Sequence, residues 1–364
     1  MNQPDELISA LEFQRNITPS EPTIREAACR VGKDVDRDFV GCPATVIAVD
    51  SKEGGMTMPA EVKRKVVVAG GNGFLGRNLK LFLEQAGFSV SVLTRNPKTK
   101  GDIQWDAKSL GDWAEDLDGS FALINLAGRT VDCRYNEKNK AAILNSRIDS
   151  TNVLHQAVAG CNEPPAIWMN SSTSTIYNDT RGNAPANTEV ANNIGDDFSM
   201  GVARKWEACF FDVDLPNTVQ TALRTAIVMG RDGGAFPIMS KIARFGLCSP
   251  QGAGDQWISW LHIEDFCRAV LFLLHNPIDG TVNLCSPNPI QNRDFNQLLR
   301  EQVKPWFTFP QPVWLLKLGA IFLQTEPELI LKSRKVAPAR LHEAGFEFEF
   351  AEAKQLLQDL INTD

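Results

Sequence analysis

Tyrosine is scarce in this chain of 364 residues. The sequence has 20 Phe and 8 Trp but only two Tyr, Tyr135 and Tyr177. A phenol can act as a general acid or base at a reacting oxygen. A mechanism that needs a tyrosine therefore has only these two candidates, which narrows the search before any motif is considered.

Four further absences argue against whole classes of protein. Asp and Glu number 44 against 37 Lys and Arg, a net charge of −7 without a basic block, so no nucleic-acid partner is expected. The eight cysteines form no C-x-x-C pair, which argues against a zinc site or a disulfide framework and favours a reducing compartment. The apolar run Val313–Leu323 contains Lys317 and is too short for a membrane span. Residues 1–6 lack the features of a signal peptide. We expect a cytoplasmic protein without a membrane partner.

Strand-like and helix-like patterns alternate in the first half of the chain after residue 62. Alternation over this length is typical of a doubly wound parallel sheet. We expect strands at 65–69, 89–93, 121–126, 166–169, 219–223 and 226–229, and helices at 74–86, 139–158 and 197–211. Residues 1–62 are interpreted as an N-terminal extension of unknown role, and 63–230 as a nucleotide-binding domain. Residues 231–364 are interpreted as a smaller cap or substrate domain with helices at 263–274, 292–301 and 351–360. The strand and helix near 257–274 are expected to return to the core of the first domain.

A glycine-rich loop follows the first predicted strand and opens the first predicted helix. It has the form G-x-x-G-x-x-G. In a Rossmann fold the first glycine permits a tight turn, the second lets the backbone approach a pyrophosphate, and the third allows close helix–strand packing. The N–H groups of the helix then face the phosphate. This context predicts that a dinucleotide contacts Gly70, Gly73, Phe74, Leu75 and Gly76, the alternative being a plain glycine-rich turn.

The end of the second predicted strand indicates which dinucleotide binds. An NAD site usually offers an acidic residue there for the ribose hydroxyl, whereas an NADP site offers a basic one for the 2′-phosphate. Here the strand runs into Arg95, whose guanidinium can bind a phosphate in a bidentate manner. We therefore expect NADP(H) in preference to NAD(H). The alternative is a solvated arginine at a strand end.

Several segments resemble the atypical extended short-chain dehydrogenase/reductases, and in particular the SDR39U1-like NAD(P)-dependent epimerase/dehydratase family. The resemblance covers roughly residues 63–361. It implies an NADP(H)-binding Rossmann domain, a C-terminal cap domain, and cofactor contacts at Leu126, Ala127, Gly128 and Arg147. The segments that carry it are the glycine loop, Leu93–Pro97, Asn125–Gly128, Ser146-Arg147, Lys205–Glu207, Leu223–Thr225, Gly233–Ala235, Gln256–Asp265 and Leu341–Phe346. Arg147 stands where extended members commonly carry Asn, and a solvated arginine on a helix face is the alternative to a phosphate or substrate contact.

The superfamily's catalytic pair is missing. Its usual members carry a Tyr and, four residues later, a Lys on the same helix face, and the cation lowers the phenol pKa. Tyr135 is followed at that spacing by Asn139, and Tyr177 by Arg181. The helix expected at 197–211 carries neither the Tyr nor the Lys. The position of the Tyr is occupied by Phe198, Ser199 or Met200. The position of the Lys is occupied by Val202, Ala203 or Arg204.

Remnants of a catalytic site remain as candidates. Ser172 and Thr173 match the strand end that carries the superfamily's hydroxyl, although such hydroxyls also bond to nearby backbone. Lys205 is a candidate cation or general acid, with a surface lysine or a nicotinamide-ribose contact as the alternatives. We interpret His262 and Asp265 as structural, Asp265 as the cap of a helix over 266–274. The other histidines are scattered, so no metal site is predicted.

Two functions of different class follow from these observations. The first is an NADP(H)-dependent oxidoreductase or nucleotide-sugar epimerase that acts on a small-molecule substrate. The second is a catalytically silent NADP(H)-binding regulator or scaffold, for example in cell division. The resemblance also makes a homodimer an expectation. Neither the substrate nor turnover itself follows from the sequence.

Overall fold

The computed structural model describes residues 63–191, 193–247, 249–305 and 332–362. They belong to one compact unit, Glu61–Asp364. The predicted N-terminal extension, residues 1–62, lies outside the described residues, and so does the apolar run at 313–323.

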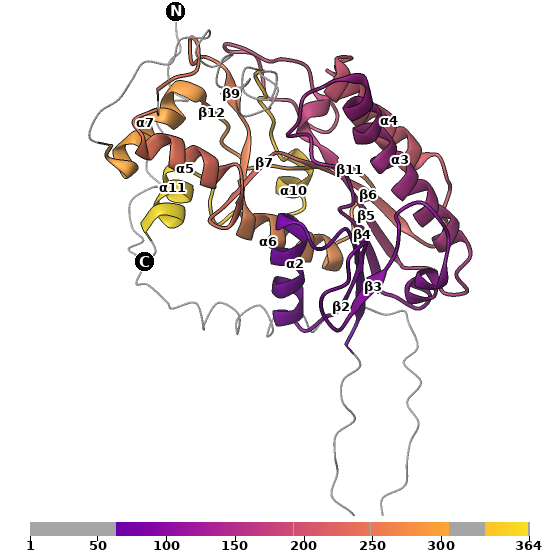
Figure 1. Ribbon diagram of the computed structural model, residues 1–364. Coiled ribbons are helices and arrows are strands. Elements are labelled where there is room, and N and C mark those ends of the chain that lie inside the picture. The colour runs from indigo at the N-terminus through magenta and orange to yellow at the C-terminus, as the bar shows by residue number, and fades with distance from the viewer. Residues whose placement is uncertain (1–62, 192, 248, 306–331, 363–364) are drawn as a thin grey trace, which may run out of the picture. The chain divides into compact units, whose positions relative to one another are not determined.

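The described residues form one large parallel sheet (Figure 1). Each strand of this sheet runs parallel to its neighbours. The predicted doubly wound α/β fold is therefore confirmed. In spatial order the seven strands are β11 (Gly280–Leu284), β6 (Val219–Thr225), β5 (Ile167–Thr173), β4 (Ala122–Asn125), β1 (Lys65–Ala69), β2 (Ser89–Thr94) and β3 (Asp102–Gln104).

Alternate residues of the central strands face two hydrophobic cores. Val66 and Val68 of β1 face the core that contains Leu79 of α2 (Phe74–Gln85) and Phe266 of α6 (Ile263–His275). Val67 faces the other core, which α3 (Glu137–Ala159), α4 (Phe198–Phe211) and the 3₁₀ helix η1 (Asp112–Leu117) cover. The side-chain period of two along a strand places helices on both faces of the sheet. Its carboxyl edge is thereby left for loops.

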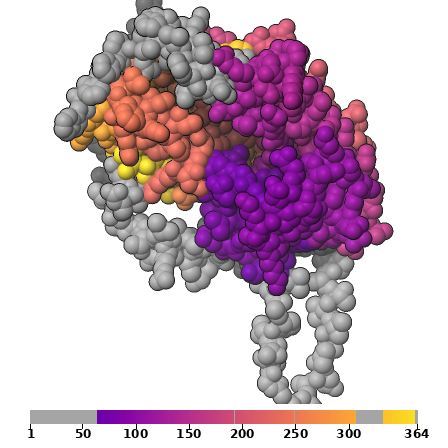
Figure 2. All heavy atoms as spheres, viewed as in Figure 1, coloured from indigo at the N-terminus to yellow at the C-terminus, as the bar shows by residue number. Residues whose placement is uncertain are grey.

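A smaller set of elements follows β6. Most of them share a core that includes Phe236, Trp260 and Phe295, whereas Leu341 packs in the core of α2 and α6. Figure 2 shows orange residues from this second half lying against indigo residues from the start of the described chain. The elements are β7 (Ile227–Gly230), β8 (Gly233–Gly234), α5 (Phe236–Arg244), β9 (Trp257–Ile258), β10 (Trp260–His262), β12 (Ile290–Gln291), α7 (Asn292–Val303), α10 (Ala339–Glu343) and α11 (Ala353–Asn362).

The chain crosses back to the main sheet after this second set has begun. Helix α6 packs in the same core as α2, and β11 then pairs with β6 at the edge of the sheet. Strand β10 pairs with β7 in a separate three-stranded sheet. Strands β3 and β11 were not among the predicted strands. The domain boundary at residue 230 stays a prediction.

The predicted cap of α6 is wrong. The helix begins at Ile263, and the Nδ1 atom of His262 accepts a hydrogen bond from the Glu264 N–H at 3.1 Å. The carboxylate of Asp265 is fully buried and accepts the N–H groups of Glu349 and Phe350 at 3.0 and 2.9 Å. Asp265 thus ties the C-terminal segment to α6, and sequence spacing could not reveal this because its partners lie more than 80 residues away.

Candidate dinucleotide and catalytic site

The glycine loop has the backbone that a dinucleotide site requires. Gly70 has a φ of +75°, a left-handed conformation that favours glycine. A Cβ at this position would lie 2.8 Å from the Cα and N atoms of Ala127, in the loop after β4. Gly70 therefore permits both the turn and the close contact between the two loops at the carboxyl edge of the sheet.

Gly76 and Gly73 differ in their surroundings. A Cβ at Gly76 would lie 2.4 Å from the Cα and O atoms of Gly71, so this glycine allows α2 to pack closely on the loop. A Cβ at Gly73 would meet only the O atom of Gly70, at 3.9 Å. Within the described residues, no side chain caps α2 and no acidic residue lies in its first turn. The uncapped N–H groups and the open space beside Gly73 fit an anionic pyrophosphate.

Phe74, by contrast, is a packing residue. Its ring lies where side chains at Gly230 and Gly233 would otherwise stand, 2.7 and 2.4 Å from the corresponding Cβ positions. It therefore fastens the β7–β8 hairpin to the start of α2. Because the ring is used in this packing, the group of Phe74 that is left to contact a cofactor is its backbone N–H.

The side chain of Arg95 is exposed at the carboxyl end of β2. Asn72 of the glycine loop donates from Nδ2 to Thr94 Oγ1 at 2.8 Å, and Gln104 donates to the Arg95 carbonyl at 3.0 Å. These bonds hold the loop and the strand end together. No described residue pairs with the Arg95 guanidinium, which suits the binding of a phosphate.

The loop after β4 is fixed by a buried asparagine. Asn125 Oδ1 accepts the Ala127 N–H at 3.0 Å, and its Nδ2 donates to Asn170 Oδ1 at 2.7 Å. This places Leu126, Ala127 and Gly128 beside the glycine loop, where the resemblance predicted cofactor contacts.

Arg147 of α3 lies next to that loop. A Cβ at Gly128 would be 3.4 Å from the Arg147 Cζ atom. The guanidinium donates to the carbonyls of Ile143 and Arg129 at 2.8 and 3.2 Å and lies 5.1 Å above the Trp206 ring. Burial lowers the pKa of Arg147 to about 10, an effect that the charge of Tyr135 opposes, so the group remains a cation at neutral pH. No described carboxylate forms an ion pair with it, so Arg147 is suited to an anionic ligand.

Ser172 belongs to a buried polar network. Its hydroxyl donates to Glu207 Oε1 of α4 at 2.5 Å. Glu207 also accepts two hydrogen bonds from Arg224 of β6, at 2.9 and 2.8 Å. Arg224 donates to the Tyr177 hydroxyl at 2.9 Å, and Tyr177 donates to Asn283 Oδ1 of β11 at 2.9 Å. The network therefore joins β5, β6, β11 and α4 at the carboxyl edge.

The charges of this network are fixed by their surroundings. Burial opposes ionisation of Arg224, but the hydrogen bonds and charge of Glu207 raise the pKa of Arg224 above its ordinary value. Burial raises the pKa of Tyr177, and the nearby Arg224 offsets this only in part. Tyr177 is therefore a neutral phenol at physiological pH, and Glu207 and Arg224 form a buried ion pair.

The other two catalytic candidates lie apart from this network. Thr173 Oγ1 accepts the Thr175 N–H at 3.1 Å and so caps the 3₁₀ helix η2 (Ser174–Ile176). Lys205 is exposed on α4, while Glu207, two residues later, points at the sheet. Residues two apart lie on opposite sides of a helix, so the structure does not bring Lys205 to Ser172 or Thr173.

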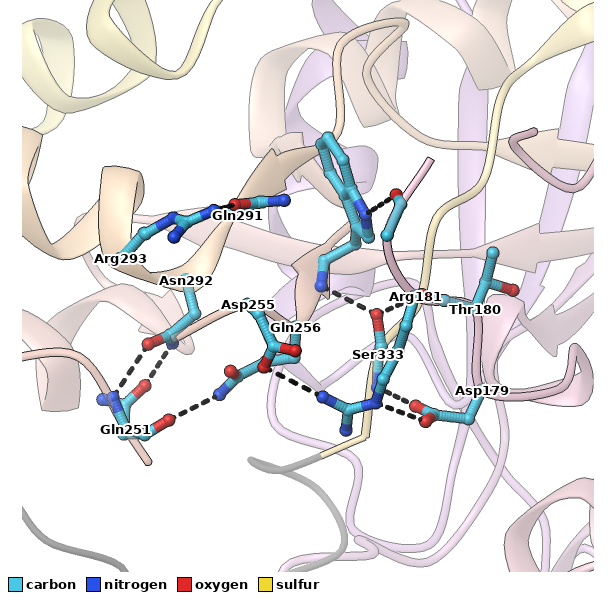
Figure 3. Close-up of polar contacts among 12 residues, drawn as sticks. Asp179, Thr180, Arg181, Gln251, Asp255, Gln256, Gln291, Asn292, Arg293 and Ser333 are labelled. Carbon is cyan, nitrogen blue, oxygen red and sulfur yellow. Dashed lines mark hydrogen bonds and ion pairs between the residues drawn. The ribbon is translucent and has the colours of Figure 1, made fainter. Parts of the chain in front are cut away.

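The loop between η2 and α4 bonds to Asp255, just before β9, and to Ser333, much later in the chain (Figure 3). Arg181 bridges Asp179 at 2.8 Å and Asp255 at 3.1 Å, and the hydrogen bond that it donates to Asp179 raises the pKa of Arg181. Ser333 bonds to Asp179 and accepts the Trp257 N–H at 2.8 Å. This polar cluster positions the loop over the carboxyl edge of the sheet.

Sequence reasoning missed Glu207 as a site residue. A glutamate on an amphipathic helix is usually a solvated residue, and only the pairing of Ser172 with Arg224 on adjacent strands creates its buried partner. No group of His, Cys, Asp and Glu within the described ranges is placed to hold a metal ion. None of the helices described is both long and apolar enough to cross a membrane.

The sheet and the glycine loop define a Rossmann-like dinucleotide-binding protein. Residues 66–195 match the model of the NAD dependent epimerase/dehydratase family, and residues 311–360 match a domain of unknown function, DUF1731. The human epimerase family protein SDR39U1 is 30% identical over 304 residues, which is 82% of this chain and 99% of that protein. An epimerase family protein of Staphylococcus epidermidis is 29% identical over 306 residues, again 82% of this chain and 99% of the relative.

Two solved structures extend the comparison. Human SDR39U1 with NADPH superposes with a TM-score of 0.73 at 28% identity, covering 82% of this chain and 99% of that one. A nucleoside-diphosphate sugar epimerase from Corynebacterium glutamicum has a TM-score of 0.67 at 26% identity, covering 82% of this chain and 58% of that one. The chain therefore belongs to the SDR39U1-like epimerase family.

Two glycine variants separate folding from binding. Gly76→Ala forces a Cβ into Gly71, and we expect the free energy of unfolding to fall by about 1–3 kcal/mol. Gly73→Ala has room and an ordinary φ of −75°, so its stability should change by less than about 0.5 kcal/mol. Its NADPH affinity should nevertheless fall by about tenfold or more, equivalent to about 1.4 kcal/mol. Urea unfolding and fluorescence titration measure the two effects. Unchanged NADPH binding by Gly73→Ala would contradict the open loop as the phosphate site.

The buried ion pair predicts a stability loss. Glu207→Ala leaves the Arg224 guanidinium buried without its carboxylate, and we expect unfolding to require about 3–5 kcal/mol less. Arg204→Ala, on the exposed face of the same helix, is the matched control and should change stability by about 0.5 kcal/mol at most. Equal urea midpoints for the two variants would show that the pair does not stabilise the fold.

Proposed function

We propose that the protein is an NADP(H)-dependent oxidoreductase or epimerase that acts on a small-molecule substrate. The observation that carries the proposal is the open, uncapped glycine loop with the exposed Arg95 beside it. The NADPH in the human relative's structure supports the choice of cofactor. The nucleoside-diphosphate sugar epimerase similarity supports testing nucleoside-diphosphate sugars first.

Different residues bind different parts of the cofactor. The N–H groups at the start of α2 hold the pyrophosphate, Gly73 lets it approach, and Arg95 pairs with the 2′-phosphate. NADP(H) supplies or accepts a hydride when bound. We assign the positioning of the reacting oxygen to Thr173 rather than Ser172, because Ser172 is buried against the charged Glu207, whereas Thr173 is half-buried and donates only to the neutral hydroxyl of Thr175 at 3.0 Å.

One observation favours the alternative function of an NADP(H)-binding regulator. The ion pair of Glu207 and Arg224 engages Ser172, and α4 contains no tyrosine. A protein that binds NADP(H) through the loop but lacks a proton donor would sense the cofactor without turning over a substrate. Binding and turnover must therefore be measured separately.

Cofactor choice tests Arg95. Arg95→Ala removes charged hydrogen bonds to the 2′-phosphate, so NADPH affinity should fall by about 10- to 100-fold while NADH affinity stays the same. Lys98→Ala, a cation in the same exposed segment, is the control and should leave both affinities unchanged. Fluorescence titration measures the affinities of the unchanged protein and of both variants for NADPH and for NADH. Equal affinity of the unchanged protein for NADPH and NADH would refute the role of Arg95, and binding of neither would refute the proposed function.

Turnover distinguishes the enzyme from the regulator. We expect NADPH consumption, or sugar interconversion followed by chromatography, with a nucleoside-diphosphate sugar or with the dicarbonyl probe phenanthrenequinone. Thr173→Ala should lower kcat by about tenfold, the effect of one lost hydrogen bond in the transition state. Ser172→Ala is the matched hydroxyl deletion and should have the smaller kinetic effect. Tight NADPH binding with no turnover of any of these compounds would favour the regulator.

A further inference from the structure

We propose that Tyr135 is the proton donor of this site and that Arg147 is the cation that stabilises its tyrosinate. The inference rests on the proposed function. Helix α4 lacks the acid, and in this proposal the loop before α3 supplies it.

The first argument is the position of the phenol ring. Tyr135 packs edge-to-face on Phe198, with 4.9 Å between the ring centroids. Phe198 is the first residue of α4 and one of the three residues that stand where the superfamily carries its tyrosine. The chain therefore places a tyrosine ring against one of the three residues that stand in the place of the usual tyrosine. The half-buried Tyr135 approaches the same end of α4 from another segment.

The second argument is a continuous path of contacts from the glycine loop. Gly70 lies against Ala127, the next residue is Gly128, and Gly128 lies against the Arg147 guanidinium. Arg147 in turn interacts electrostatically with Tyr135 and packs on Trp206 of α4. This series of contacts links the pyrophosphate loop to Tyr135 through Arg147.

The third argument is charge. Arg147 is held in place by two carbonyls and an aromatic face, and no described carboxylate neutralises it. A second cation, Lys140, lies 5.6 Å above the Phe198 ring, although Glu137 pairs with it at 3.1 Å. Nearby cations favour the ionised form of a phenol. The superfamily's lysine has this effect on its tyrosine, and here an arginine on α3 takes that role.

The other tyrosine cannot serve. Tyr177 is fully buried, and its hydroxyl is engaged by Arg224 and Asn283. Burial also raises its pKa. Of the two tyrosines in the sequence, only Tyr135 has a ring that is partly exposed.

The reduction brings one hydride and one proton to the carbonyl group of the substrate. When bound, a reduced nicotinamide would supply the hydride, which is two electrons and one hydrogen, to the carbonyl carbon of the substrate. The Tyr135 O–H bond breaks, and its proton goes to the carbonyl oxygen, which forms the alcohol. Arg147 stabilises the resulting tyrosinate until it takes a proton from water. In the oxidative direction the tyrosinate accepts the alcohol proton.

The scarcity of tyrosine makes a spectroscopic test specific. Tyrosinate absorbance is followed against pH in the protein without cofactor, and Tyr135→Phe leaves only Tyr177 to titrate. We expect the phenol that ionises at the lower pH to vanish in Tyr135→Phe. Arg147→Met should move that ionisation up by about one pH unit or more. Arg147→Lys keeps the charge and should move it less, which guards against an effect of misfolding. An unmoved ionisation in Arg147→Met would overturn the proposal.

Kinetics provide the second test. Tyr135→Phe keeps the ring on Phe198 and removes only the hydroxyl, so kcat for NADPH-dependent phenanthrenequinone reduction should fall by about 100-fold. The Kd for NADPH should stay within about twofold, a factor worth less than about 0.5 kcal/mol. Wild-type turnover that survives in Tyr135→Phe overturns this inference alone. If Tyr135→Phe loses NADPH affinity but keeps its kcat, Tyr135 is a cofactor contact and not the proton donor, which also overturns this inference. An inactive wild type contradicts both this inference and the proposed function.

Discussion

The ion pair between Glu207 and Arg224 is the interaction on which the carboxyl edge of the sheet depends. Removing two charges from water costs several kcal/mol per ion, and the cost is offset only when the geometry is good and the remaining polar atoms are satisfied. Here the guanidinium meets the carboxylate in a bidentate manner, the Ser172 hydroxyl donates to the same carboxylate, and the Tyr177 hydroxyl accepts a third N–H of the guanidinium. Helix α4, strands β5 and β6 and the loop after η2 can then adopt only one relative arrangement. Through Asn283, which bonds to Tyr177, the constraint extends to β11.

The same ion pair limits where chemistry can occur. In the usual superfamily arrangement the strand-end hydroxyl and the helix residues contact the substrate, whereas here the Ser172 hydroxyl donates a hydrogen bond to Glu207. Two arginines illustrate the difference. The buried Arg224 has its own carboxylate and needs no ligand, whereas the half-buried Arg147 is surrounded by carbonyls and an aromatic ring. A partly desolvated cation without a carboxylate partner is stabilised when an anion approaches. The electrostatics therefore point to the Arg147 side of α4 for ligand and proton chemistry.

Local patterns made much of the fold predictable. The apolar run 65–69 and the glycines after it specify a buried strand, a turn and a helix start, all within a dozen residues. Strand β11 was missed because its place in the sheet depends on the chain returning after α6, and its sequence alone has no distinctive pattern. The sequence predicts Asp265 as a helix cap, because its actual partners, the N–H groups of Glu349 and Phe350, are remote in sequence and cannot be recognised from it. Glu207 was missed for the same reason. The limits of prediction lie at buried polar residues, whose partners are set by tertiary contacts.

The two tyrosines show how one residue type takes on different roles through its surroundings. A phenol in a dry, fully hydrogen-bonded site is locked as a structural donor, because burial disfavours its anion. That is the position of Tyr177, which links Arg224 to Asn283. A phenol at a half-buried surface beside an unpaired guanidinium can give up its proton and take it back from water. Tyr135 has that environment, supplied by α3 and the loop before it rather than by α4. Loss of the tyrosine from α4 therefore need not mean loss of the acid, since a neighbouring loop can present the same group to the same edge of the sheet.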